Sequence, residues 1–164
     1  MINLNFLNTL DLYHGGILVI MVGPPGAGKT TVADDIVDNF ENFVLVSPDN
    51  IRKEFNTTNL DLSQTEIVFE KVYKQLNDSL KSGKNVVYDA TNCRSTYRHK
   101  IINVCRHYTY KIICVMSTTP ISECIKRNNE RNGAVPEDVI EKMYFNLRKH
   151  PPVIFEGYDY IVRF

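Results

Sequence analysis

The chain has 164 residues and carries 19 lysines and arginines against 19 aspartates and glutamates, so its formal net charge is zero at pH 7. This length predicts one domain of ordinary size rather than two. Hydrophobic residues make up 43% and charged residues 23%, close to globular averages, which argues against a disordered, collagen-like or coiled-coil chain. A neutral total also argues against a protein that coats nucleic acid through charge alone.

The four cysteines stand at positions 93, 105, 114 and 124, too far apart for motifs that use close cysteine pairs. Metal fingers and thioredoxin-type motifs need such pairs, so we expect no bound structural metal. Four thiols without a signal peptide at Met1 predict a cytoplasmic protein. The longest strongly apolar run, Ile17–Val22, is too short to cross a bilayer, so no membrane segment is expected.

Short apolar runs, typical of buried strands, alternate along the chain with longer segments of helical period. Strands are expected over Ile17–Val22, Phe43–Val46, Val86–Tyr88, Tyr110–Met116 and Asp159–Phe164. Helices are expected over Lys29–Phe40, Asn50–Phe55, about 63–80, about 95–107, from Pro120 and from Pro136.

This alternation with long crossovers predicts an α/β fold in which a parallel sheet is covered by helices on both faces. Residues 1–16 show no period and are expected to form an N-terminal extension to a domain over residues 17–164. In parallel sheets of this kind, ligands bind at the carboxyl ends of the strands. The residues just after each strand are therefore the candidates for a functional site.

The first predicted strand is followed by Gly23-Pro24-Pro25-Gly26-Ala27-Gly28-Lys29-Thr30, which satisfies the phosphate-loop pattern G-x-x-x-x-G-K-[ST]. The glycines allow consecutive N–H groups to turn toward a phosphate, and the following helix adds the positive end of its dipole. Lys29 is expected to reach the β- and γ-phosphates of ATP, and Thr30 to ligate Mg²⁺. The predicted ATP-binding residues of this segment are Gly23, Gly26, Ala27, Gly28, Lys29, Thr30 and Thr31.

Two predicted strands are followed by an aspartate at the same edge of the sheet. Asp49 follows Phe43–Val46, and Asp89 follows Val86–Tyr88. Such an aspartate can hold a Mg²⁺ water, as in a Walker B site, or accept a proton from an attacking hydroxyl. The structural alternatives are a helix N-cap for Asp49 and an Asx turn for Asp89. Arg52, three residues after Asp49, is placed to hold a phosphate of the acceptor.

Arg127 and Arg131 are four residues apart and share one face of a predicted helix. The polar segment 127–133 ends in glycine, as a mobile lid over an active site would. Such arginines can neutralise charge on a transferring phosphoryl group. The structural alternative is an exposed arginine pair in which Arg127 bridges to Glu123.

These segments together resemble the polynucleotide 5′-kinase family, the P-loop kinases of nucleic-acid end repair. The resemblance covers about residues 17–147, in the family's order and at similar spacing. The segments that carry it are Gly23–Thr30, Ser47-Pro48-Asp49-Asn50-Ile51-Arg52, Asp89-Ala90-Thr91-Asn92, Lys126-Arg127-Asn128-Asn129-Glu130-Arg131 and Val135-Pro136.

The resemblance implies a P-loop kinase fold with an arginine-bearing lid. It makes Asp49 the general base for a 5′-hydroxyl and Arg52 an anchor for the nearest phosphate of the acceptor. The candidate site residues fall into catalytic residues, contacts to ATP or acceptor outside the loop, and one metal ligand. The resemblance gives Lys29, Asp49 and Arg127 as catalytic residues, Arg127 and Arg131 as lid contacts to ATP, and Thr30 as the ligand of Mg²⁺. Its acceptor contacts are Asp49, Arg52, Thr91 and Asn92. Arg94 is a further candidate acceptor contact, on the ground of the charge distribution described below.

The expected activity is therefore ATP-dependent phosphorylation of a 5′-hydroxyl end on DNA or RNA. The alternatives are a P-loop kinase of a small metabolite, a nucleoside or an aminoacyl-tRNA, and a nucleotide-dependent switch. Against the switch, the chain has no N-K-x-D motif for guanine recognition. It also has no D-x-D phosphatase motif, so no 3′-end-processing activity is expected from these residues.

The neutral total conceals an uneven distribution of charge. Residues 31–83 hold 5 basic and 10 acidic side chains, whereas residues 84–131 hold 9 basic and 3 acidic ones. The basic block includes Arg94 and Arg98, four apart on one predicted helix, for which a solvated helix face and phosphate contact are both open. The neutral total charge of the chain is therefore compatible with a local basic groove that binds one end of a nucleic-acid strand.

Overall fold

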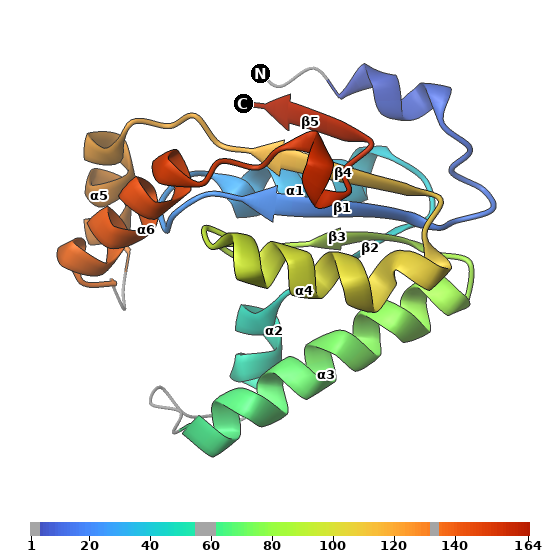
Figure 1. Ribbon diagram of the computed structural model, residues 1–164, viewed down its shortest axis with the longest axis horizontal. Coiled ribbons are helices and arrows are strands. Elements are labelled where there is room, and N and C mark those ends of the chain that lie inside the picture. Colours follow the sequence, from blue (N-terminus) through green and yellow to red (C-terminus); the bar gives the residue numbers. More distant parts are fainter. Residues whose placement is uncertain (1–3, 55–61, 132–134) are drawn as a thin grey trace.

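The computed structural model describes residues 4–54, 62–131 and 135–164 and shows a parallel sheet of five strands (Figure 1). The strand order is β2-β3-β1-β4-β5, which puts β1 in the middle. The strands are β1 (Ile17–Val22), β2 (Phe43–Val46), β3 (Asn85–Tyr88), β4 (Lys111–Met116) and β5 (Tyr160–Arg163).

Both faces of the sheet are buried, as β1 shows most directly. All six of its residues are buried. Leu18 and Ile20 belong to the core cluster on one face, whereas Ile17 and Val19 belong to the cluster on the other. Successive side chains of a strand point to opposite faces, so a central strand covered on both sides needs a continuous apolar run.

Helices cover the two faces of the sheet, and others stand at the carboxyl ends of the strands (Figure 1). Ala33 and Ile36 of α1 pack on one face, and Val72 of α3 and Ile101 of α4 pack on the other. Helices α5 and α6 contact each other beside the end of β1. The helices are α1 (Lys29–Asn39), α2 (Pro48–Lys53), α3 (Leu62–Lys81), α4 (Ser95–Cys105), α5 (Ile121–Asn129) and α6 (Glu137–Lys149), with short 3₁₀ turns η1 (Asn5–Thr9), η2 (Arg106–Tyr108) and η3 (Ile154–Glu156).

The residues before β1 pack against the sheet on the same face as α1. Leu4 and Leu7 are buried in the cluster that contains Ile17. The Asn85 side chain donates through Nδ2 to the carbonyl of Leu12 and accepts through Oδ1 from the N–H of Ile17. From residue 4 onward, this N-terminal segment therefore contributes to the core and is tied to the starts of β1 and β3.

The predicted α/β class is confirmed, and each predicted strand agrees with the observed one to within one residue at either end. The short helix expected over 50–55 begins earlier, at Pro48, and residue 55 lies outside the described residues. The Ser47 hydroxyl caps this helix by accepting from the N–H of Asp49. The N-cap alternative for Asp49 is therefore wrong.

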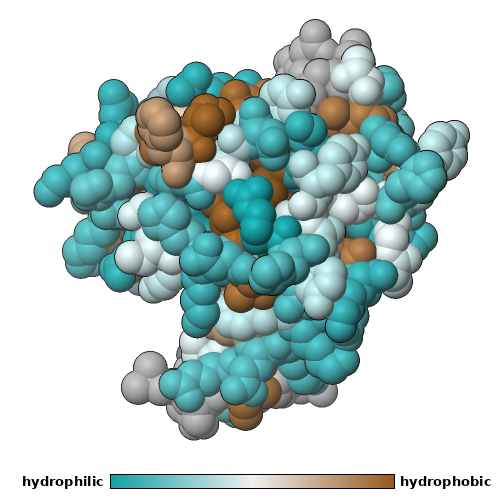
Figure 2. Space-filling view, turned by 45° about the vertical axis from the view of Figure 1, so that its right-hand side comes forward, coloured by the Kyte–Doolittle hydropathy of each residue, from teal (hydrophilic) through white to brown (hydrophobic). Residues whose placement is uncertain are grey.

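Within the three described ranges, no helix is long and apolar enough to cross a membrane. On the face shown in Figure 2, hydrophobic residues form small areas that hydrophilic residues separate. Scattered apolar surface of this kind is usual on a globular domain.

Arg98 of α4 is fully buried and forms a two-pronged ion pair with Glu156 of η3. Its Nε lies 2.7 Å from Oε2 and its Nη2 lies 2.6 Å from Oε1. The guanidinium also donates to the carbonyls of Asn92 and His150. Both interpretations of Arg98 from the sequence, solvated face and phosphate contact, are wrong. The side chain instead joins α4, the turn after β3 and the segment between α6 and β5.

We expect Arg98→Ala to lower the free energy of unfolding by about 3–5 kcal/mol, because it leaves the Glu156 carboxylate buried without a counter-charge. Chemical denaturation measures this change. Lys142→Ala is the control, since it breaks an exposed pair with Asp138 and is expected to leave the denaturation midpoint almost unchanged. If the two variants lost equally little stability, the buried pair would not hold these segments together.

Candidate active site

The carboxyl ends of the three neighbouring strands β2, β3 and β1 bring the predicted site residues to one edge of the sheet (Figure 1). The phosphate loop follows β1, Asp49 follows β2 by three residues, and Asp89 directly follows β3. Because β3 lies next to β1, Asp89 is the nearer of the two aspartates to the loop along the sheet. The order of strands thus separates the two aspartates: Asp89 lies next to the phosphate loop and Asp49 lies further from it.

The phosphate loop takes a backbone path that depends on glycine at two positions. Gly26 has φ +77° and Gly28 has φ +86°, both left-handed. A Cβ on Gly26 would collide with the carbonyl oxygen of Cys124 in α5. Gly28 is the N-cap of α1 and has no side-chain oxygen to cap the helix. The N–H groups of the first turn therefore stay available to an anion.

Lys29 is buried in the first turn of α1, and its Nζ donates to the carbonyl of Pro24 at 2.9 Å. Burial lowers the pKa of its ammonium group, and the Asp89 carboxylate opposes that effect. The charge is thus held with little water around it. Because little water solvates this ammonium group, the negative charge of a bound polyphosphate would stabilise it strongly. This environment fits the predicted role of Lys29 toward the phosphates of ATP.

Thr30 joins the start of α1 to the end of β3, because its hydroxyl donates to Oδ2 of Asp89 at 2.7 Å. Burial raises the pKa of the Asp89 carboxyl, whereas this hydrogen bond and the Lys29 charge lower it. Mg²⁺ prefers oxygen ligands, and in nucleotide sites it is held by protein oxygens together with phosphate oxygens of the nucleotide. The residues present therefore fit a Mg²⁺ ion, and the geometry favours the Walker B interpretation of Asp89 over an Asx turn.

Ala27 contributes to the loop through its backbone, since its methyl group is buried against Cys124 and Ile140. Its carbonyl accepts hydrogen bonds from the hydroxyls of Ser117 and Thr119, at 3.0 and 3.1 Å. Sequence reasoning missed both hydroxyl residues. Their position just after the fourth predicted strand, at the ligand-binding edge, was the signal that could have found them.

Asp49 and Arg52 lie together on α2, where the Asp49 Oδ1 accepts from the Arg52 Nη1 at 2.6 Å. The Asp49 side chain is 81% exposed and the Arg52 side chain 38% exposed. The structure thus brings together the predicted proton acceptor and the predicted phosphate anchor, and both are open to an acceptor.

The three predicted acceptor contacts after β3 have different surroundings. The carbonyl of Thr91 accepts from the N–H of Gly23 at 2.9 Å, which places Thr91 directly beside the phosphate loop. The Asn92 side chain is buried and donates to the carbonyl of Met21 at 2.8 Å, so it holds the turn against β1 rather than facing an acceptor. Arg94 is exposed at the start of α4 and lies over the ring of Tyr97.

Arg127 lies in the last turn of α5, where its Nε donates to Glu123 at 2.7 Å. This is the ion pair of the structural alternative, yet the same guanidinium also faces the loop. Its Nη1 lies 3.7 Å from the point where a Cβ of Gly28 would stand. Arg131 is exposed beyond the end of α5, and residues 132–133 of the predicted lid lie outside the described residues.

Asn128 is a further residue that sequence reasoning missed in the predicted lid. It is buried, and its side chain donates to the carbonyl and accepts from the N–H of Val135. It therefore fixes the end of α5 to Val135, which lies two residues before the start of α6. One asparagine in a polar run carries no pattern that could have revealed this bridge.

We expect Gly26→Ala to weaken ATP binding at least tenfold, because the added methyl group must displace the loop or α5 and a left-handed alanine is strained by about 1–3 kcal/mol. Isothermal titration calorimetry measures the dissociation constant. Gly83→Ala is the matched control, since Gly83 also has a positive φ of +79° but a Cβ there would meet only the carbonyl oxygen of His14, at an ordinary contact distance of 3.8 Å. Equal affinity in the two variants would show that contact with α5 does not shape the loop.

The chain is similar to considerably longer proteins and to a kinase closer to its own length. It is 25% identical to the L-seryl-tRNA(Sec) kinase of Methanococcus maripaludis over an alignment 136 residues long, and the match covers 78% of this chain and 51% of that protein. A chain in the structure of the Pnkp1/Rnl/Hen1 RNA repair complex is 26% identical, with a TM-score of 0.77, over 86% of this chain and 47% of that one. This chain thus spans about half the length of both relatives.

A gluconokinase from Sinorhizobium meliloti 1021 shows the same fold at 19% identity, with a TM-score of 0.58 over 93% of this chain and 83% of that one. The model of the AAA_33 family, described as an AAA domain, matches residues 18–150. The match takes in the phosphate loop, both aspartates and α5. The chain therefore belongs to the AAA_33 family of AAA domains, and its sheet and loop have the fold of a P-loop kinase.

Proposed function

We propose that this chain is an ATP-dependent kinase that transfers the γ-phosphate to the 5′-hydroxyl end of DNA or RNA. The observation that carries the proposal is the pair of Asp49 and Arg52, exposed at the edge that also bears the phosphate loop. A carboxylate can take a hydroxyl proton, and a guanidinium can hold a phosphate. An acceptor that fits the pair carries a hydroxyl with a phosphate nearby, as a 5′-hydroxyl nucleic-acid end does.

In this mechanism, Asp49 accepts the proton of the 5′-hydroxyl while the hydroxyl oxygen bonds to the γ-phosphorus and the bond from that phosphorus to ADP breaks. Lys29 holds the β- and γ-phosphates, and Arg127 adds positive charge beside Gly28 of the loop. When bound beside Thr30 and Asp89, Mg²⁺ supplies neutralisation of the charge on the phosphate oxygens.

The similarity to a chain of an RNA repair complex supports a polynucleotide acceptor. The similarity to a seryl-tRNA kinase supports the alternative, an aminoacyl-tRNA whose hydroxyl takes the phosphate. Both acceptors place a hydroxyl near nucleic-acid phosphates, so both fit the Asp49–Arg52 pair. They differ in which hydroxyl is phosphorylated.

Transfer of a labelled γ-phosphate to a panel of acceptors tests the proposal. We expect label on a 5′-hydroxyl oligonucleotide and none on the same oligonucleotide with a 5′-phosphate. Seryl-tRNA, a nucleoside and gluconate complete the panel. Label on seryl-tRNA alone would establish the alternative, and ATP hydrolysis with every acceptor unlabelled would contradict kinase activity on this panel.

We expect Asp49→Asn to lower kcat on the oligonucleotide by on the order of a hundredfold or more while ATP affinity stays unchanged, because the amide cannot take the hydroxyl proton. Single-turnover assays give the rate, and nucleotide titration gives the affinity. Asp38→Asn, an exposed aspartate of α1, is the control. Near-normal transfer by Asp49→Asn would remove Asp49 from the proton-accepting role.

We expect Arg52→Ala to raise KM about tenfold for acceptors that carry a phosphate next to the reacting nucleoside, because a charge-assisted hydrogen bond is lost. A 5′-hydroxyl oligonucleotide is compared with a nucleoside that has no phosphate. Lys53→Ala, which removes the neighbouring exposed cation, serves as control. Equal losses on both acceptors would mean that Arg52 does not contact an acceptor phosphate.

A further inference from the structure

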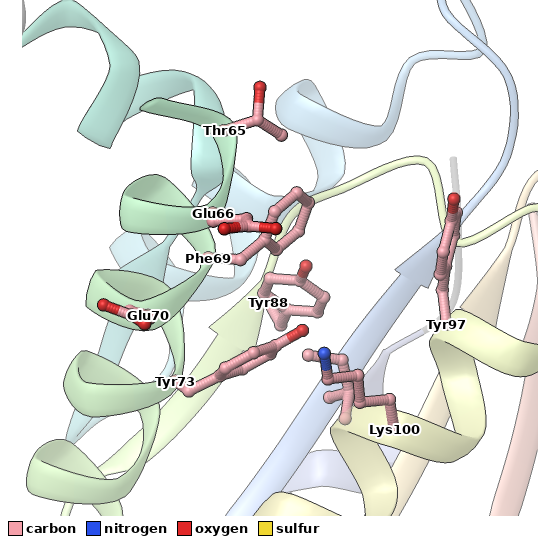
Figure 3. A pocket seen from close by; sticks show the side chains of 9 residues that line it. Thr65, Glu66, Phe69, Glu70, Tyr73, Tyr88, Tyr97 and Lys100 are labelled. Atoms are coloured by element: carbon pink, nitrogen blue, oxygen red, sulfur yellow. The ribbon is translucent and has the colours of Figure 1, made fainter. Parts of the chain in front are cut away.

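A groove of about 460 Å³ runs between α3 and α4 where β3 ends (Figure 3). Four aromatic rings line it: Phe69 and Tyr73 from α3, Tyr88 from β3 and Tyr97 from α4. In Figure 3, Tyr97 stands across the groove from the two rings of α3, and in this view Tyr88 lies between Phe69 and Tyr73. The groove therefore offers aromatic surfaces on both walls.

The rings are held with different degrees of freedom. Tyr88 is 2% exposed, so it is fixed in the core, and the Phe69 and Tyr73 rings lie 6.2 Å apart at a tilt of 35°. Tyr97 is 54% exposed, which is the largest exposed fraction among these four aromatic residues. A large exposed aromatic side chain facing three others is a stacking surface for a planar ligand.

The charged side chains at the groove do not suit a phosphate. Glu66 and Glu70 of α3 line it, and their carboxylates repel anions. The one lysine among the lining residues, Lys100, holds its Nζ 4.9 Å from the centroid of the Tyr73 ring. Acidic oxygens beside aromatic rings instead suit an uncharged ring that carries N–H donors.

The groove adjoins the proposed acceptor site. Tyr88 directly precedes Asp89 in the sequence. Burial raises the pKa of the Tyr88 phenol, and the charge of Arg52 opposes that rise, so Arg52 lies close enough to Tyr88 to interact with it. On its other side, Tyr97 also lines a cavity of about 440 Å³ with Thr91, Arg94 and Lys142. Tyr97 therefore stands between an aromatic, acidic groove and a basic one.

We propose that the aromatic groove between α3 and α4 binds the base of the acceptor's 5′-terminal nucleotide, stacked between Tyr97 and the rings of α3. This inference rests on the proposed function. The sugar of that nucleotide then lies toward Asp49 and Arg52, and the phosphates that follow run along the side of Arg94 and Lys142. The uneven distribution of acidic and basic charge along the sequence fits this division between base and backbone.

Two oligonucleotides that differ at one position test the proposal. One carries a normal 5′-terminal nucleotide, and the other carries a tetrahydrofuran residue there, which keeps the 5′-hydroxyl and the next phosphate but has no base. Stacking on aromatic side chains contributes enough that we expect KM to be about tenfold higher for the abasic acceptor. If both were phosphorylated with the same KM, the proposed function would stand and the base site would be wrong. If neither were phosphorylated, the proposed function itself would fail, and this inference with it.

Variants of Tyr97 identify the groove as the place where the base binds. We expect Tyr97→Ala to raise KM for the normal acceptor about tenfold and to leave KM for the abasic acceptor unchanged, whereas Tyr97→Phe keeps the wild-type pattern. Phe69→Ala, on the opposite wall, should show the same selective loss. Tyr13→Ala removes an exposed tyrosine from the N-terminal segment and should change neither value. Equal effects of Tyr97→Ala on both acceptors would overturn the proposal.

Discussion

The close packing of the phosphate loop against α5 and the end of β4 is the constraint on which the candidate site depends. Gly26 leaves room for the carbonyl of Cys124, while the carbonyl of Ala27 takes hydrogen bonds from Ser117 and Thr119. The loop is thereby fixed from three directions, by β1, by α5 and by the turn after β4. Because the loop already has its shape before a ligand binds, it loses little conformational entropy on binding.

The buried pair of Arg98 and Glu156 plays a corresponding part on the acceptor side. Arg98 also holds the carbonyl of Asn92, and the Asn92 side chain in turn holds the carbonyl of Met21 at the end of β1. The turn that carries Thr91 is thus braced against both the central strand and the segment before β5. These interior polar contacts position the backbone of the site, whereas its exposed charges form ion pairs at the surface, Asp49 with Arg52 and Arg127 with Glu123.

The parts of the fold that sequence predicted are those whose cause lies within a few consecutive residues. Eight adjacent residues encode the phosphate loop, and each strand is an apolar run that only a doubly covered sheet accommodates. The missed features join distant positions: Arg98 meets a carboxylate 58 residues later, and Ser117 meets a carbonyl 90 residues earlier. Asn92 was predicted to contact the acceptor, but its side chain is buried and bonded to the Met21 carbonyl of the neighbouring strand, which no local pattern reveals. The aromatic groove likewise needs three elements to meet.

The buried charges of Lys29 and Asp89 have a consequence for the evolution of this domain. Burial opposes ionisation of both groups, so each charged side chain destabilises the empty fold relative to a neutral side chain of similar shape. Substitutions that stabilise the domain are therefore easy to find at these two positions, and the same substitutions remove the features that a nucleotide needs. Persistence of both charges in a sequence is a mark of selection for ligand binding, acting against selection for stability alone.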